Sequence, residues 1–178
     1  MTTARVQNGA SSVGLFLAHA VELESEAADR YDELADSLEA YNNVEVAQLF
    51  RDLAGYSRKH RDQVKSIADE FGPLPKVAPW EFQWDHTAES PEAAAFENAH
   101  YLMTPHHALK MAEVCELQGQ KYYAAVASET KDPTVATLAR EFADEEGGHV
   151  ELVRRWLERY PTPPEGWDED PDPPNYSE

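Results

Sequence analysis

Apolar residues recur every three or four positions in several long stretches of the chain, which is the period of an α-helix with one buried face. The first stretch runs from Val13 to about Tyr41 and the second from Val46 to Phe71. The third runs from Pro105 to Ala127, and the last from Pro133 to Trp156. The pattern therefore predicts an all-α fold of four long helices.

Short signals separate these stretches. The pair Asn42-Asn43 predicts a tight turn after the first helix, and Gly72-Pro73 ends the second. Thr104-Pro105 and Asp132-Pro133 each combine a capping residue with a proline suited to the first helical position. Long helices joined by turns this short must run antiparallel, so we expect two helical hairpins.

The helical period is lost between residues 72 and 104, where several prolines occur. A connection of this length matches a crossover along a bundle, so we predict a ferritin-like antiparallel four-helix bundle with a long crossover between helices two and three. The expected division is an N-terminal arm over residues 1–12, the bundle over 13–160 and an acidic proline-rich tail over 161–178. Trp80 and Trp84 in the crossover suggest contact with a partner subunit, so we expect a homodimer.

Charge and composition narrow the class of protein. The chain has 34 Asp and Glu against 15 Lys and Arg, a formal net charge of -19, which argues against nucleic acid and anionic membranes as partners. No stretch reaches the ~20 apolar residues needed to span a bilayer. Cys115 is the single cysteine, so no disulfide or thiolate zinc cluster can form within the chain. We expect a cytoplasmic protein.

Carboxylates and imidazoles interrupt the apolar faces near the middle of the helices. These inward positions are Glu24, His60, Glu116, Glu146 and His149. An unpaired carboxylate in a bundle core costs several kcal/mol or takes up a proton. A divalent cation would satisfy all of these groups together. Carboxylate and imidazole without sulfur suit iron or manganese, with zinc possible, whereas the histidines argue against calcium.

The two predicted hairpins share this pattern. Glu24 and Tyr31 of the first helix repeat at the same spacing as Glu116 and Tyr123 of the third, which indicates an internal duplication. The last helix supplies Glu146-Gly-Gly-His149, a Glu-x-x-His pair on one helix face. The second helix reads Ser57-Arg-Lys-His60, so the corresponding carboxylate is missing.

With these residues, the chain resembles rubrerythrin-type members of the ferritin-like superfamily over about Val13 to Tyr160. The resemblance is strongest at Glu24–Tyr31, Thr104–Leu109 and Phe142–His149. It implies two iron ions held by carboxylates and imidazoles. In the roles it implies, Glu24 and Glu116 are terminal ligands, Glu146 is a bridge, and His60 and His149 are imidazole ligands.

Further residues have roles that the resemblance only suggests. Rubrerythrins place another Glu one turn from the ligand of the third helix, and Glu113 matches it, so Glu113 is a candidate substitute for the carboxylate missing at Ser57. Tyr31 and Tyr123 are either hydrogen-bond donors to the ligands or core aromatics with satisfied hydroxyls. Gly147 and Gly148, which lie inside a helix, either leave access to the metals for dioxygen or peroxide or allow a close helix contact.

The resemblance implies a di-iron oxidoreductase that reduces peroxide or dioxygen. Rubrerythrins also carry a small four-cysteine iron domain that delivers electrons, and a chain with one cysteine cannot contain it. Electrons must then come from an external donor protein, or from ferrous iron itself. Two alternatives stay open: an iron-binding ferroxidase that stores iron, and a degenerate bundle with one metal or none.

Overall fold

The computed structural model describes residues 12–78 and 100–169. It contains the helices α1 (Ser12–Ala40), α2 (Val44–Asp69), α3 (Pro105–Glu129) and α4 (Pro133–Leu157). The described residues form no strand, so the predicted all-α fold with four long helices is confirmed.

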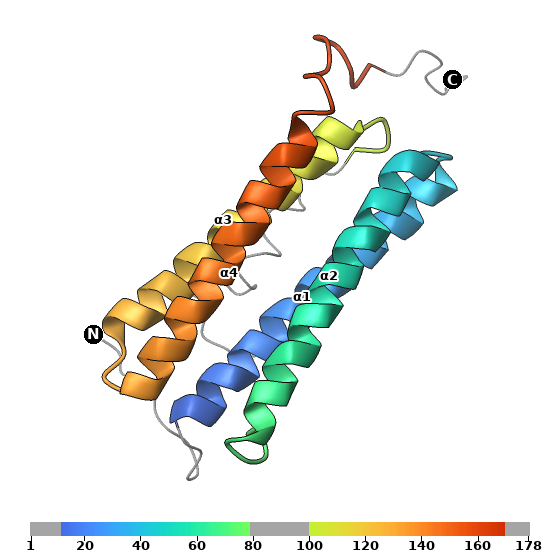
Figure 1. The fold of residues 1–178 in the computed structure, drawn as a ribbon. Helices are drawn as coiled ribbons and strands as arrows, with labels where there is room; N and C mark the ends of the chain where they lie inside the picture. Colours follow the sequence, from blue (N-terminus) through green and yellow to red (C-terminus); the bar gives the residue numbers. More distant parts are fainter. Residues whose placement is uncertain (1–11, 79–99, 170–178) are drawn as a thin grey trace, which may run out of the picture.

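The helices form two antiparallel hairpins that lie side by side (Figure 1). Helix α1 packs along α2, and α3 packs along α4. Between the hairpins, α1 and α4 run in one direction and α2 and α3 in the other (Figure 1). Much of the predicted crossover, with Trp80 and Trp84, lies outside the described residues, as do residues 1–11 of the arm and 170–178 of the tail.

The predicted turn and capping signals act as expected. Asn42 adopts a φ of 60°, the left-handed conformation that Asn tolerates, and reverses the chain between α1 and α2. Asp132 Oδ1 accepts hydrogen bonds from the backbone N–H groups of Thr134 at 2.9 Å and Val135 at 3.3 Å, which caps α4. At the start of α3, the backbone N–H of Thr104 donates to His107 Nδ1 at 3.2 Å.

The apolar core forms two clusters at different heights along the bundle. One cluster contains Phe50, Leu109 and Val153 and joins the C-terminal half of α1 to the N-terminal halves of α2 and α3. The other contains Phe16 and Phe142 and joins the opposite halves of the helices. A level between the two clusters is left for polar side chains. None of the helices in the described ranges is long and apolar enough to cross a membrane.

Part of the predicted tail folds back on the bundle. The ring centroids of Trp167 and His107 are 3.7 Å apart, and Trp167 packs against the apolar cluster around Phe50. His106 Nδ1 lies 3.1 Å from the carbonyl oxygen of Tyr160 and donates to it. These contacts join the start of α3 to the segment that follows α4.

The two glycines inside α4 have different surroundings. A Cβ atom at Gly147 would lie 2.7 Å from Nε2 of Gln120, the far end of a flexible side chain on α3, which would have to move. Gly148 is exposed, and a Cβ atom there would meet no heavy atom within 4 Å. Neither position therefore strictly requires glycine. A side chain at position 147 would have to displace the Gln120 amide, whereas a side chain at position 148 would meet open space.

The substitution Gly148→Ala is expected to stabilise the protein by about 1 kcal/mol, because alanine loses less backbone entropy in a helix and meets open space. Urea denaturation followed by circular dichroism would measure the change. The comparison variant is Gly147→Ala, which must displace the Gln120 amide and should gain less. A loss of stability in Gly148→Ala would contradict this account of the site.

Candidate metal centre

The inward ionisable side chains meet at the level between the two apolar clusters. They come from all four helices: Glu24 from α1, His60 from α2, Glu116 from α3, and Glu146 and His149 from α4. All of them line one pocket. The structure therefore brings together the set of residues that the helical period singled out.

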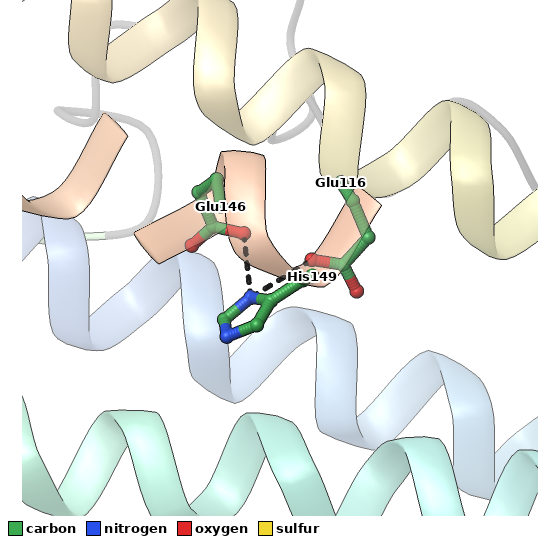
Figure 2. Close-up of side chains that lie close together, drawn as sticks. All are labelled: Glu116, Glu146 and His149. Atoms are coloured by element: carbon green, nitrogen blue, oxygen red, sulfur yellow. Dashed lines mark hydrogen bonds and ion pairs between the residues drawn. The ribbon is translucent and has the colours of Figure 1, made fainter. Parts of the chain in front are cut away.

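In three of these residues the side chains are close enough for ion pairs centred on His149 (Figure 2). His149 Nδ1 lies 3.2 Å from Glu146 Oε2 and 3.3 Å from Glu116 Oε2. One ligand atom from each of the three residues can be chosen so that all lie within 4.8 Å of one another. Figure 2 shows the carboxylates of Glu116 and Glu146 converging on the imidazole from α3 and α4. A single cation between them could contact a donor atom from each.

Glu24 and His60 extend this cluster toward the first hairpin. His60 Nδ1 lies 3.8 Å from Glu24 Oε1, too far for a hydrogen bond. The imidazole rings of His60 and His149 stack with centroids 4.1 Å apart and planes 8° from parallel. The stacked rings are a direct contact between α2 and α4.

Two of the carboxyl groups, those of Glu24 and Glu146, are destabilised as anions when no cation is bound. Glu24 and Glu146 are each only 4% exposed. Burial raises the pKa of Glu24 well above its ordinary value, and the carboxylates of Glu146 and Glu116 raise it further. Burial also raises the pKa of Glu146 to about 8, despite the hydrogen bond from His149. Glu146 therefore holds a proton at neutral pH unless a cation replaces it, and the raised pKa of Glu24 favours its protonated form.

The two histidines are shifted in opposite directions. Burial lowers the pKa of His149, but hydrogen bonds to Glu116 and Glu146 outweigh burial and raise it to about 10. Burial and the positive charge of His149 lower the pKa of His60 to about 4. At neutral pH a neutral imidazole is therefore stacked on an imidazolium, which avoids two positive charges in contact.

One side of the pocket has space where the duplication would place a carboxylate. Ser57 is 8% exposed and lines the pocket, in the position on α2 that corresponds to Glu146 on α4. Tyr56 and Trp156 complete this side, with ring centroids 6.2 Å apart, and Tyr56 is 39% exposed. Sequence reasoning missed Tyr56, because it lies off the apolar face of its helix. The pocket therefore reaches the surface between α2 and α4.

Glu113 does not line this pocket. Its Oε1 accepts a hydrogen bond from Arg154 Nε at 2.8 Å, and its Oε2 pairs with Lys110. These hydrogen bonds from Lys110 and Arg154 lower the pKa of Glu113. Its role as a metal ligand stays a prediction, and in this conformation both of its oxygens bind cationic side chains.

Tyr31 and Tyr123 are buried in the apolar clusters on either side of the pocket and do not line it. Tyr31 stacks on Phe50 with ring centroids 5.9 Å apart, and Tyr123 meets Phe16 edge-on at 6.1 Å. These contacts favour the core-aromatic interpretation. Donation by either hydroxyl to a ligand stays a prediction.

The chemistry of the donors fits a hard or borderline divalent cation. The pocket offers carboxylate oxygens and imidazole nitrogens, and Cys115 is not among its lining residues. Such a set suits iron, manganese or zinc. Since burial disfavours the charged carboxylates, a bound cation would remove the energetic problem that the metal-free cluster presents.

A solved structure of an uncharacterised conserved protein from Magnetospirillum magnetotacticum MS-1 is similar to this chain. The two sequences are 42% identical, the match covers 86% of this chain and 99% of the other, and the TM-score is 0.63. No curated protein matched the chain. The similarity therefore extends through both hairpins but comes with no known activity.

The family model described as Rubrerythrin matches residues 16–103. This segment contains Glu24 and His60, whereas Glu116, Glu146 and His149 lie in the second hairpin, where the structure brings them to the same pocket. Together with the four-helix fold and the carboxylate and histidine cluster, this match shows that the chain belongs to the rubrerythrin family.

Proposed function

We propose that this protein is a non-haem iron oxidoreductase of rubrerythrin type, which reduces peroxide or dioxygen with electrons from an external donor. The observation that carries the proposal is the meeting of three glutamates and two histidines in one pocket at the middle of the bundle. Two iron ions are proposed as the cofactor. Family membership supports this choice, and manganese or zinc would suit the same donors.

The side chains of the pocket have distinct tasks in this proposal. Glu24, Glu116 and Glu146 would supply negative charge to the cations, and His60 and His149 would supply neutral nitrogen donors. Bound iron would supply electrons to the oxidant. The apolar clusters above and below the pocket exclude water along the bundle axis. Ser57, with its short side chain, leaves space beside the ligands for a small oxidant.

Reduction of hydrogen peroxide consumes two electrons and two protons and breaks the O–O bond to give two molecules of water. The sequence has one cysteine, so no four-cysteine iron site can form within these 178 residues. We therefore propose that a separate electron-donor protein supplies the electrons. The net charge of -19 favours a donor with a basic docking surface.

One alternative has support from specific residues. Ser57 removes a possible ligand, and Glu113 is engaged by Lys110 and Arg154, so the pocket offers five donor residues. This favours weak binding of a second ion, or a site with a single cation. The number of ions bound per chain separates the alternatives, and the rate of reaction with peroxide separates an oxidoreductase from an iron store.

Protons and cations compete for this pocket. In the metal-free protein Glu146, with a pKa of about 8, and His149, with a pKa of about 10, hold protons at pH 7. Burial raises the pKa of Glu24, which favours its protonated form. A metal ion that binds these groups must displace the protons, so its affinity rises with pH.

The affinity for Mn²⁺ is therefore expected to rise between pH 6 and 8 by about tenfold per pH unit for each proton displaced. The rise should become less steep above pH 8, where Glu146 has lost its proton in the metal-free protein. Calorimetric titrations in buffers of different ionisation enthalpy would count the released protons. An affinity independent of pH would contradict the assignment of these groups as ligands.

The same groups set the pH dependence of metal-free stability. The pKa of Glu146 is raised from 4.5 to about 8 on folding, so its stabilising contribution is complete below pH 4.5 and is lost as pH rises through 8. The stabilising contribution of His149 is complete below pH 6.5 and is lost as pH rises through about 10. His60, with a lowered pKa of about 4, changes stability only below pH 6.5.

We expect the titration of Glu146 alone to lower the melting temperature in the presence of a chelator by roughly 3 °C between pH 7 and pH 9, and the titration of His149 to lower it further. Glu146→Gln should reduce this fall, because the glutamine has no proton to lose. Glu145→Gln, which changes the exposed neighbour on α4, serves as the control and should melt like the native chain. Thermal scans by circular dichroism would measure all three proteins, and equal slopes would count against the buried carboxyl.

The proposed activity is tested by anaerobic loading with ferrous iron, followed by stopped-flow mixing with peroxide or dioxygen. We expect about two iron ions per chain, as in di-iron bundles, and faster oxidation by peroxide than by dioxygen. Glu146→Gln should weaken iron binding at least tenfold, since it removes a ligand, whereas Glu145→Gln should not. Native protein that binds no iron would refute the proposal, and slow oxidation without peroxide consumption would favour storage.

A further inference from the structure

Glu113 has surroundings that differ from those of every other glutamate discussed above. Its carboxylate is buried, with 8% of the residue exposed, yet it is not part of the pocket. Arg154 Nε donates to one oxygen at 2.8 Å, and Lys110 pairs with the other. The two cationic side chains therefore occupy both oxygens of a carboxylate that has little contact with water.

This ion-paired group lies next to the metal pocket. Glu113 precedes Glu116 by three residues on α3, so the two side chains leave the helix on the same face, one turn apart. Arg154 follows His149 by five residues on α4. The pairing of Glu113 with Arg154 thus bridges α3 and α4 about one turn from the point where Glu116 meets His149.

The pocket itself is short of one carboxylate. The hairpin duplication pairs His149 with Glu146 on α4, but it pairs His60 with Ser57 on α2. Two divalent cations carry four positive charges, and the three glutamates of the pocket can balance only three of them. A fourth carboxylate would balance the charge, and Glu113 is a buried carboxylate within one turn of a pocket ligand.

We propose that Arg154 and Lys110 act as a lock that holds the Glu113 carboxylate away from the pocket, and that this lock limits how tightly a second cation binds. The inference rests on the proposed function, because it concerns the same metal pocket. With the lock closed, the five pocket residues hold one cation tightly and a second one weakly. With the lock open, Glu113 is available as a further ligand.

The lock can open because its cationic partners are close to solvent. The side chains of Arg154 and Lys110 are 47% and 53% exposed, whereas that of Glu113 is 10% exposed. Water can take over the solvation of both cations as they leave, so the carboxylate can exchange them for a metal ion. Arg154 also pairs with the exposed Glu151 at 3.0 Å, which offers it an alternative partner.

The test is a titration with Co²⁺, a cation that is stable in air and reports its coordination by visible absorption. The native chain is compared with the double variant Arg154→Met and Lys110→Met, with equilibrium dialysis and metal analysis to count bound ions. The expected result is a second binding step at least tenfold tighter in the double variant, with a changed absorption spectrum for the second ion. The first step should change much less.

Three variants separate the lock from general effects of charge. Arg155→Met removes one positive charge from the neighbouring position on α4, so it measures long-range attraction of cations. Glu151→Gln removes the exposed partner of Arg154 and leaves the pairing with Glu113 in place. Both should keep the native second step to within about threefold. Glu113→Gln added to the double variant should restore the weak second step.

These measurements distinguish failure of the lock from failure of the proposed function. If the second step is the same in the native chain and the folded double variant, or if Arg155→Met tightens it equally, the lock is wrong and Glu113 only joins α3 to α4. In both cases metal binding by the native chain would still support the proposed function. If the native chain binds no Co²⁺ and no ferrous iron, the proposed function itself fails and the lock fails with it.

Discussion

The burial of carboxyl groups at the middle of a helical bundle, reinforced by their mutual repulsion, is the constraint on which this structure depends. Glu24 and Glu146 are nearly inaccessible to water, and Glu116 approaches the same pocket. In the metal-free state the protein meets this constraint with protons, as the raised pKa values of Glu24 and Glu146 indicate. Burying these groups lowers the stability of the fold. A cation that replaces the protons would remove this destabilisation, and the free energy regained would add to its binding affinity.

The arrangement of the bundle follows from signals that act locally. Asn42 reverses the first hairpin, and Asp132 caps the helix that completes the second. Because each hairpin is antiparallel, residues near the middle of its two helices come to the same height. The apolar clusters then occupy the two ends and leave the polar level between them. The helices, their order and the depth of the ligands could therefore be predicted from periodicity and capping residues.

Other features of the site could not be predicted from that pattern. The engagement of Glu113 depends on Arg154, which is distant in sequence and meets Glu113 only when α3 and α4 pack together. The stacking of His60 on His149 depends on the relative position of two hairpins, which no local signal specifies. Tyr56 lies off the apolar face of its helix, so its place at the rim of the pocket became visible only in three dimensions. Periodicity identifies which side chains face inward but not their partners.

The two apolar clusters also determine from which side of the bundle ions and small molecules can reach the pocket. They close the bundle along its axis, whereas Tyr56 and Trp156 border the pocket on the flank between α2 and α4. Ions, oxidant and released water must then enter and leave through this flank, perpendicular to the bundle axis. A neighbouring molecule resting on that flank would obstruct passage, while one resting on either end of the bundle would leave it open.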